Sequence, residues 1–121
     1  MTTATKSLIE QQVKGFNAGN IDDVVAGYAD DATFVLASAH TLPGSELRLE
    51  GREKITRHLQ RVIDNGISGV EIDWSGEGEG FLAWHDHGTF GADTSFSEAH
   101  LARLNDDGKI IHHLIHSVYA K

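Results

Sequence analysis

The chain has 121 residues, of which 40% are hydrophobic, and a formal net charge of −8 at neutral pH. This length fits a single domain (1–121) around one core, and the negative charge argues against nucleic acids and anionic membranes as partners. The absence of cysteine excludes disulfides and thiolate metal sites, and the lack of a secretory signal or a membrane-spanning apolar run predicts a cytoplasmic protein.

The first half of the chain has the pattern of three helices around one strand. Apolar residues at helical spacing predict an amphipathic helix over 4–18, and Asn20 is a good N-cap for a second helix. The segment "ATFVLAS" (32–38) predicts a strand, and 39–50, which contains the only proline, predicts a loop. The segment "GREKITRHLQRVIDNG" (51–66) predicts a third helix that ends at its Asn-Gly pair.

The second half changes to the two-residue period of β-strands. Strand candidates cover 69–75, 81–90, 95–104 and 109–119, separated by turns rich in glycine, asparagine and aspartate. Helices followed by antiparallel strands predict an α+β fold, in which the three helices pack on one face of a curved, mainly antiparallel sheet.

The stretch "AWHDHGTFG" (83–91) raises the main functional question. Side chains alternate along a strand, so His85 and His87 share one face and Asp86 takes the other. A pair of imidazoles in a dry pocket is suited to general acid–base catalysis, whereas the same pair facing outward is ordinary polar surface. The register of this strand decides whether the pair faces the pocket or the outside. A shift of one residue would place Trp84 and Asp86 inside instead.

Four segments occur in an order that is typical of a known superfamily. They are "YADDATF" (28–34), "GREKITRHL" (51–59), "GTFG" (88–91) and "DDGKIIHH" (106–113). With them the chain resembles the nuclear-transport-factor-two-like superfamily, and most of all its SnoaL-like branch, which includes polyketide cyclases and has ketosteroid isomerase and limonene-epoxide hydrolase as relatives. The resemblance implies a cone whose curved sheet wraps an internal apolar cavity. It implies no single reaction, because this fold hosts isomerases, cyclases, hydrolases, dehydratases and binding proteins.

Three positions where these relatives carry acid–base residues are apolar in this chain. The general-base aspartate of ketosteroid isomerases aligns with Leu36, and the aspartate on the last strand of cyclases and epoxide hydrolases aligns with Ile115. The histidine of the cyclases' "GTH" motif aligns with Phe90. An enzyme built on this chain must therefore use other residues.

Histidines are the candidates that remain. In the same comparison, the cavity-facing Arg-x-Asp pair of the epoxide hydrolases aligns with His85 and His87, and His113 shares the face of Ile115. We therefore expect His87 and His113, with His85, to be the catalytic acid–base groups. His100 aligns with the second acidic residue of the ketosteroid isomerase pocket, and the expected substrate-binding residues are Phe16, Tyr28, Leu36, His100 and Ile115.

Two classes of function fit these expectations. The first is a small cofactorless enzyme, of the cyclase, isomerase or dehydratase type, acting on an apolar molecule that contains a carbonyl group or is polycyclic. The second is a non-catalytic ligand-binding or dimerisation module of the same fold. We expect no metal, although His85, His87 and either His100 or His113 have the spacing of a three-histidine zinc site. We also expect a homodimer through the outer face of the sheet, where the inferred register places Leu82, Trp84, Leu114 and His116.

Overall fold

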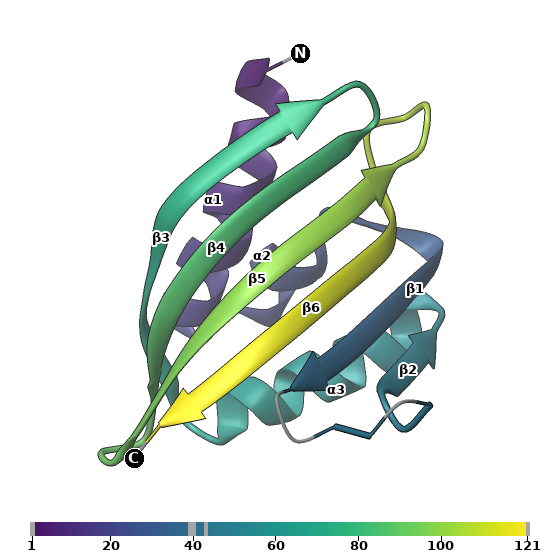
Figure 1. The fold of residues 1–121 in the computed structure, drawn as a ribbon. Helices are drawn as coiled ribbons and strands as arrows, with labels where there is room; N and C mark the ends of the chain where they lie inside the picture. The colour runs from purple at the N-terminus through teal and green to yellow at the C-terminus, as the bar shows by residue number, and fades with distance from the viewer. Residues whose placement is uncertain (1, 39–40, 43, 121) are drawn as a thin grey trace.

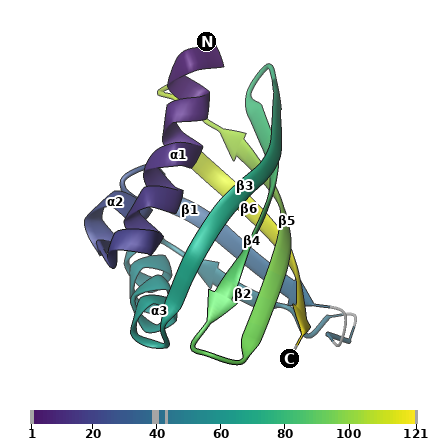
Figure 2. The ribbon, with the colours of Figure 1, turned by 90° about the vertical axis from the view of Figure 1, so that its left-hand side faces the viewer.

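The structure is a computed structural model that describes residues 2–38, 41–42 and 44–120. Within these residues, three helices cover one face of a curved, open six-stranded sheet (Figures 1 and 2). None of the described helices is long and apolar enough to cross a membrane. The elements are α1 (Thr2–Ala18), α2 (Ile21–Val25), β1 (Tyr28–Ser38), β2 (Leu47–Glu50), α3 (Arg52–Asp64), β3 (Ile67–Gly78), β4 (Phe81–Phe90), β5 (Thr94–Leu104) and β6 (Ile110–Ala120).

The sheet has the strand order β2-β1-β6-β5-β4-β3. Every neighbouring pair is antiparallel except β1 and β6, which run parallel. The expected α+β fold with a mainly antiparallel sheet is therefore confirmed. The last strand returns to the middle of the sheet, where His113 lies between Phe34 of β1 and Ala102 of β5.

The short helix α2 begins where the sequence predicts. The side-chain oxygen of Asn20 accepts hydrogen bonds from the backbone N–H groups of Asp22, at 3.1 Å, and Asp23, at 3.4 Å. Such a cap satisfies backbone donors that the first turn of a helix leaves unpaired. The cap fixes the corner between α1 and α2, and so the point from which β1 enters the sheet.

The core lies between the helices and the inner face of the sheet. Ile9 of α1, Val24 of α2 and Ile55 of α3 are buried there, together with Leu82 and Trp84 of β4. Burying a large apolar side chain contributes roughly 1.5–3 kcal/mol. The expectation that Leu82 and Trp84 lie on the outer face is therefore wrong, because their large apolar side chains gain more free energy in the core.

Two boundaries in the first half differ from the sequence analysis. β1 begins at Tyr28 rather than at residue 32, and β2 lies inside the segment expected to be a loop. β2 is only four residues long and pairs with β1 on one side. Four residues are too few to show a clear two-residue period, which explains why this edge strand escapes sequence analysis. Residues 39, 40 and 43 of the same segment lie outside the described residues.

Candidate functional site

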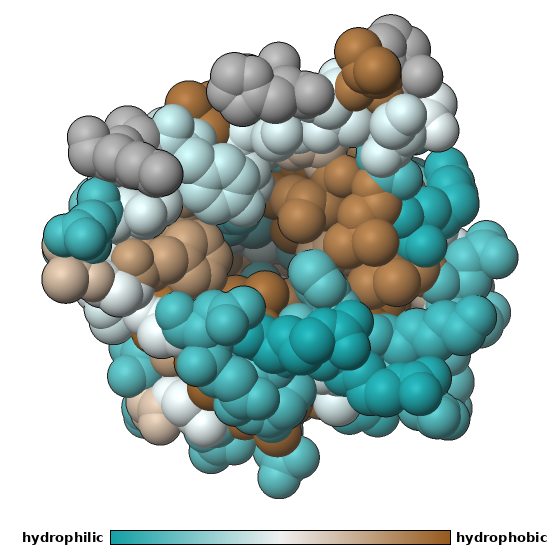
Figure 3. Space-filling model, turned by 90° about the horizontal axis from the view of Figure 1, so that it is seen from below, coloured by the Kyte–Doolittle hydropathy of each residue, from teal (hydrophilic) through white to brown (hydrophobic). Residues whose placement is uncertain are grey.

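A cavity lies between the helices and the inner face of the sheet. Seen from below, the molecule is hollowed near its centre, and hydrophobic side chains form part of the edge of the hollow (Figure 3). The cavity has a volume of about 50 Å³, which is room for a few water molecules. Its walls are largely apolar, with contributions from Phe16 of α1, Leu36 of β1 and Ile115 of β6. A small number of polar groups therefore decide what chemistry the cavity can support.

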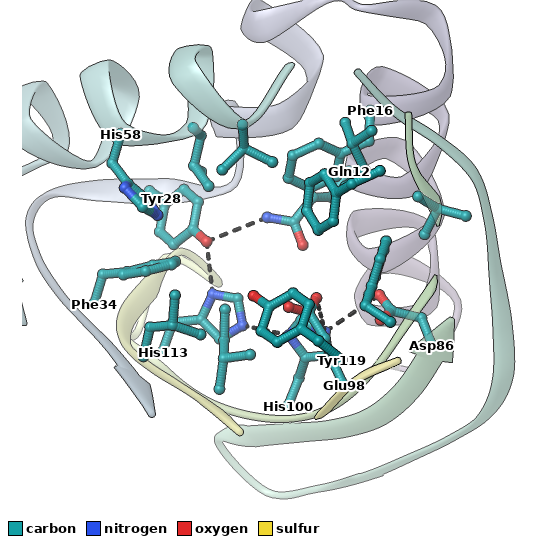
Figure 4. Close-up of a pocket in the computed structure, with 18 residues that line it drawn as sticks. Gln12, Phe16, Tyr28, Phe34, His58, Asp86, Glu98, His100, His113 and Tyr119 are labelled. Carbon is teal, nitrogen blue, oxygen red and sulfur yellow. Dashed lines mark hydrogen bonds and ion pairs between the residues drawn. The ribbon is translucent and has the colours of Figure 1, made fainter. Parts of the chain in front are cut away.

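These polar groups form a chain of hydrogen bonds that begins at α1 and crosses the cavity (Figure 4). The amide nitrogen of Gln12 donates to the hydroxyl oxygen of Tyr28 at 3.2 Å. The same hydroxyl lies 2.6 Å from Nδ1 of His113, and Nε2 of His113 lies 2.9 Å from Nδ1 of His100. One connected path therefore joins α1, β1, β6 and β5.

The path ends at two carboxylates. Nε2 of His100 lies 3.2 Å from Oδ2 of Asp86 and 3.5 Å from Oε1 of Glu98, which are ion-pair distances without the alignment of a good hydrogen bond. The other carboxylate oxygen of Glu98 accepts a hydrogen bond from the Ser117 hydroxyl at 2.6 Å. Oδ1 of Asp86 is buried and has no hydrogen-bond partner among the described residues. An unused carboxylate oxygen is therefore present at the end of the chain.

An indole ring supports His100 from the side. The rings of Trp84 and His100 are stacked, with centroids 4.4 Å apart and planes 4° from parallel. The face of an aromatic ring attracts a cation, so this contact favours the charged form of the imidazole. Trp84 also lies 5.2 Å from the His113 ring, centroid to centroid, and holds both histidines in position.

The two histidines carry different charges. Burial alone lowers the pKa of His100, but the contacts with Asp86 and Glu98 outweigh burial and raise it to about 9. Burial, followed by the charge on His100, holds the pKa of His113 well below its ordinary value of 6.5. At neutral pH, His100 is therefore an imidazolium and His113 is neutral.

This charge pattern sets the direction of the hydrogen bonds. The protonated Nδ1 of His100 donates to Nε2 of His113, so the single proton of neutral His113 lies on Nδ1 and is donated to the Tyr28 oxygen. That oxygen also accepts from Gln12. Burial raises the pKa of the Tyr28 hydroxyl, which therefore keeps its proton. We infer that this proton is available for donation to a molecule in the cavity.

The opposite pKa shifts predict a stability maximum near the ordinary histidine pKa. As the pH falls below about 6.5, the unfolded chain protonates His113 and the folded protein does not, so the free energy of unfolding falls by up to about 1.4 kcal/mol per pH unit. His100 has the raised pKa, so its stabilisation is full below about 6.5 and is lost as the pH rises towards about 9. Urea unfolding across this pH range, in the presence of a chelator, measures the free energy of unfolding on the acidic limb and on the alkaline limb of this profile. The variant His113→Gln is expected to flatten the acidic limb, and an unchanged acidic limb would contradict the assigned state of His113.

The structure corrects the expected position of two histidines. Asp86 and Trp84 point into the fold, so His85 and His87 lie on the outer face of β4. The Nδ1–H group of each donates a hydrogen bond to a carboxylate oxygen of Asp73 of β3, at 2.7 Å in both cases. The hydrogen bond with His85, together with that of His87, lowers the pKa of Asp73. The predicted register of this strand is therefore wrong by one residue, because Trp84 is the largest apolar side chain of the stretch and takes the inner face.

A β-bulge accompanies this arrangement. Ile72 pairs with Asp86 and Trp74 pairs with His85, so two steps along β3 match one step along β4. The extra residue in such a bulge re-aims the side chains around it. Asp73 is that residue, and its carboxylate reaches both His85 and His87 on the outer face. The three-histidine zinc site considered above cannot form, because these two histidines lie across the sheet from His100 and His113.

The other expected site residues do line the cavity. His113 and His100 are buried in its wall, and their proposed roles in catalysis and binding stay predictions. The same holds for the remaining expected substrate-binding residues, which are Phe16, Tyr28, Leu36 and Ile115.

Sequence analysis missed several polar members of the site. Glu98 shares one face of β5 with His100, which is a signal that the alternation along this strand contains. Gln12 and Ser117 offer no comparable signal, because single polar residues within apolar patterns are common. His58 of α3 also lines the cavity, with its ring 5.5 Å from that of Phe34. Burial and then the neighbouring charge of Arg61 lower its pKa.

Comparison with known proteins gives one family match. The family model described as "SnoaL-like domain" matches residues 9–113, which include both buried histidines and all the residues that line the cavity except Ile115 and Tyr119. No curated protein matches the chain significantly.

Solved structures share the fold at low sequence identity. A SnoaL-like protein of unknown function from Burkholderia thailandensis matches with a TM-score of 0.76 and 18% identity, covering 100% of this chain and 98% of that one. A protein of unknown function with a cystatin-like fold from Methylobium petroleophilum gives 0.76 and 18%, covering 98% and 77%. A putative ketosteroid isomerase from Kribbella flavida gives 0.72 and 17%, covering 97% and 78%. At these identities the likeness concerns the fold alone.

Proposed function

The chain belongs to the SnoaL-like domain family, and on this premise we propose that it binds a small apolar carbonyl compound in its cavity and catalyses a proton transfer on it. The family includes cyclases and isomerases, whose chemistry includes such transfers. The observation that carries the proposal is the chain of hydrogen bonds and ion pairs from Tyr28 to Asp86 inside an otherwise apolar cavity. A cavity that only had to hold an apolar ligand would have no need of this chain.

Asp86 is the proposed base. Its Oδ1 atom has no partner among the described residues and belongs to a side chain that lines the cavity. A buried polar atom without a hydrogen bond is costly, and sites of this kind often have a functional reason. Asp86 takes a proton from the carbon next to the carbonyl group, and the electron pair of the broken C–H bond moves to the carbonyl oxygen as an enolate. Returning the proton to another carbon completes an isomerisation.

Tyr28 is the proposed partner of the carbonyl oxygen. Its hydroxyl proton is free to donate because His113 and Gln12 both donate to its oxygen. A preorganised donor of this kind stabilises the negative charge that develops on the enolate. His113, expected from the sequence as an acid–base group, acts here through Tyr28 and is a positioning residue. His100 in turn fixes the orientation of His113.

The size of the cavity limits the substrate. A volume of about 50 Å³ is far below the roughly 300–1,000 Å³ of pockets that enclose drug-sized ligands. The proposal is therefore restricted to small acyclic or monocyclic carbonyl compounds, and the polycyclic substrates considered from the sequence are not part of it.

A non-catalytic binding protein is the second candidate. It is favoured by the apolar side chains of Leu36, Phe90 and Ile115, which line the cavity where relatives have acid–base residues. The two candidates differ in what happens to a bound ligand, because only the enzyme removes a proton from it.

Hydrogen–deuterium exchange distinguishes them without knowledge of the final product. A panel of small ketones and aldehydes is incubated with the chelator-treated protein in D₂O, and NMR follows the loss of protons next to the carbonyl group. The enzyme is expected to speed this exchange for a subset of ligands that bind. Ligands that bind without faster exchange would favour the binding protein, and an absence of both across the panel would contradict the substrate class.

We also propose that the protein forms a homodimer through the outer face of the sheet. Leu101 of β5 and Leu114 of β6 are cross-strand neighbours on that face and are 45% and 41% exposed. Val118, four residues further along β6, is also exposed. An apolar patch of this kind marks an interaction site more often than free surface. The variant Leu114→Glu is expected to weaken the dimer about tenfold or more, since each buried leucine contributes roughly 1.5–3 kcal/mol.

Sedimentation velocity measures this weakening. The control is Leu42→Glu, because Leu42 is an exposed leucine of the loop before β2 and lies on none of the strands. A wild-type protein that is monomeric at micromolar concentration would rule out the dimer.

A further inference from the structure

We propose that Asp86, Glu98 and His100 form a binding site for one divalent transition-metal ion, of which Zn²⁺ is the representative. This inference goes beyond the proposed function, because metal binding requires no turnover. It rests on the placement of three side chains of types that bind metals, on the distances between their atoms, and on atoms among them that lack hydrogen-bond partners.

The sheet brings the three side chains together. Asp86 of β4 and Glu98 of β5 are direct cross-strand partners, and His100 lies two residues from Glu98 on the same face of β5. One potential ligand atom from each lies within 4.8 Å of the others. No other group of three potential metal ligands comes this close among the residues that the structure describes.

The distances already approach those around a metal ion. Zinc binds nitrogen and oxygen at about 2.0–2.2 Å, so two ligand atoms of a tetrahedral site lie roughly 3.4 Å apart. Nε2 of His100 lies 3.2 Å from Oδ2 of Asp86 and 3.5 Å from Oε1 of Glu98. Both pairs that include the imidazole nitrogen therefore already have the spacing of ligands on one ion, and a ligand atom of each residue lies within 4.8 Å of the others.

Two atoms of the cluster lack hydrogen-bond partners. Oδ1 of Asp86 and Nε2 of His100 are both buried, and neither has a hydrogen bond among the described residues. The two residues are 5% and 7% exposed, respectively. Carboxylates directly opposite each other on neighbouring strands also repel. A divalent cation would displace the Nε2 proton of the His100 imidazolium, bind the freed lone pair and neutralise both carboxylates, and it would satisfy Oδ1 of Asp86 if that carboxylate bound through both oxygens.

Neighbouring groups hold two of the ligands as metal sites require. A histidine that binds metal through one nitrogen nearly always donates from the other, and Nδ1 of His100 lies 2.9 Å from Nε2 of His113 as its acceptor. Glu98 accepts from the Ser117 hydroxyl through the oxygen that faces away from His100. Hydrogen bonds on the side away from the other ligands therefore fix the orientation of His100 and Glu98.

The ligand set selects the class of metal. One imidazole and two carboxylates suit Zn²⁺, Co²⁺, Mn²⁺ or Fe²⁺, whereas Mg²⁺ and Ca²⁺ prefer oxygen ligands throughout. Three protein ligands leave a fourth position, which would face the cavity and take a water or a ligand oxygen. A bound metal occupies Asp86, so the metal-bound form would polarise a carbonyl oxygen instead of accepting a proton. This site differs in its ligands from the three-histidine site considered from the sequence, and it would reverse the expectation of a metal-free protein.

Calorimetric titration of the full chain tests the site. Chelator-treated protein is titrated with ZnCl₂, and Co²⁺ absorption spectra provide a second measurement of the ligand environment. We expect one ion per chain in the wild type and in the double variant His85→Ala/His87→Ala, which removes the surface pair. Glu98→Gln and Asp86→Asn are expected to lose the ion.

Ser117→Ala is a second test for the case in which the carboxylate variants fail to fold, because it removes one hydroxyl group and keeps all three proposed metal ligands. It is expected to weaken Zn²⁺ binding by roughly tenfold or more. The proposal is overturned if the wild type binds no Zn²⁺, if the carboxylate variants bind it unchanged, or if only the double histidine variant loses it. None of these results bears on the exchange assay, which is run in chelator.

Discussion

Replacing Asp86 with asparagine is expected to slow carbonyl-dependent proton exchange by roughly 10²–10⁴-fold, which is the usual contribution of one positioned acid–base group. Asparagine has nearly the same shape but cannot accept the proton. Glu98 remains as a partner of His100, so the chain from His100 to Tyr28 keeps its anchor. Ligand affinity is expected to change little, because the lost interaction develops only in the transition state. NMR exchange rates measured on wild type and variant, for any ligand that the screen identifies, give the ratio.

The matched control is His87→Ala. His87 is the next residue of the same strand but lies on the outer face with Asp73, so its removal is expected to leave the exchange rate within a factor of about two of the wild type. Wild-type exchange in Asp86→Asn, or a large loss in His87→Ala, would show that the base has been assigned to the wrong face of β4.

Replacing Trp84 with alanine is expected to lower the free energy of unfolding by about 3–5 kcal/mol. The indole is fully buried, at 0% exposure, and packs on both cavity histidines. Its loss leaves a cavity in the core and removes the ring that supports the His100 imidazolium. Urea denaturation, followed by circular dichroism, measures the change. A loss of this size is a large part of the stability of a typical small domain.

The chain offers a second tryptophan as the control. Trp74 is 54% exposed and stacks on His85 at the surface, so Trp74→Ala is expected to change stability by no more than about 0.5 kcal/mol. Equal effects of the two substitutions would mean that Trp84 is less important to the core than its burial indicates.

The fold could be predicted from the sequence because its patterns are local. The helical spacing before Gly19, the asparagine cap at Asn20 and the alternation after residue 69 each depend on a few neighbouring residues. The edge strand β2 was missed because its four residues are too few to show a period. The pairing of β1 with β6 depends on residues far apart in the chain, and no local pattern reports it.

The site could be predicted only in part, because its residues depend on which face of β4 points into the fold. Alternation correctly separates Asp86 from His85 and His87, but it does not say which side is inside. The comparison with relatives favoured the histidines, whereas the burial of Trp84 decides the matter in the structure. The large aromatic side chain of Trp84 therefore indicates the inner face of β4 better than the alignment with the functional positions of relatives does.

The central position of β6 has a consequence for how the protein folds. Tyr28 and His113 are 85 residues apart in the chain but share a hydrogen bond, and β1 reaches the rest of the sheet only through β6. Closing so long a loop is entropically expensive and slows folding. A chain emerging from the ribosome would therefore hold β1 and β2 apart from β3, β4 and β5 until β6 is released. The cavity and its polar groups then form together, in the last step.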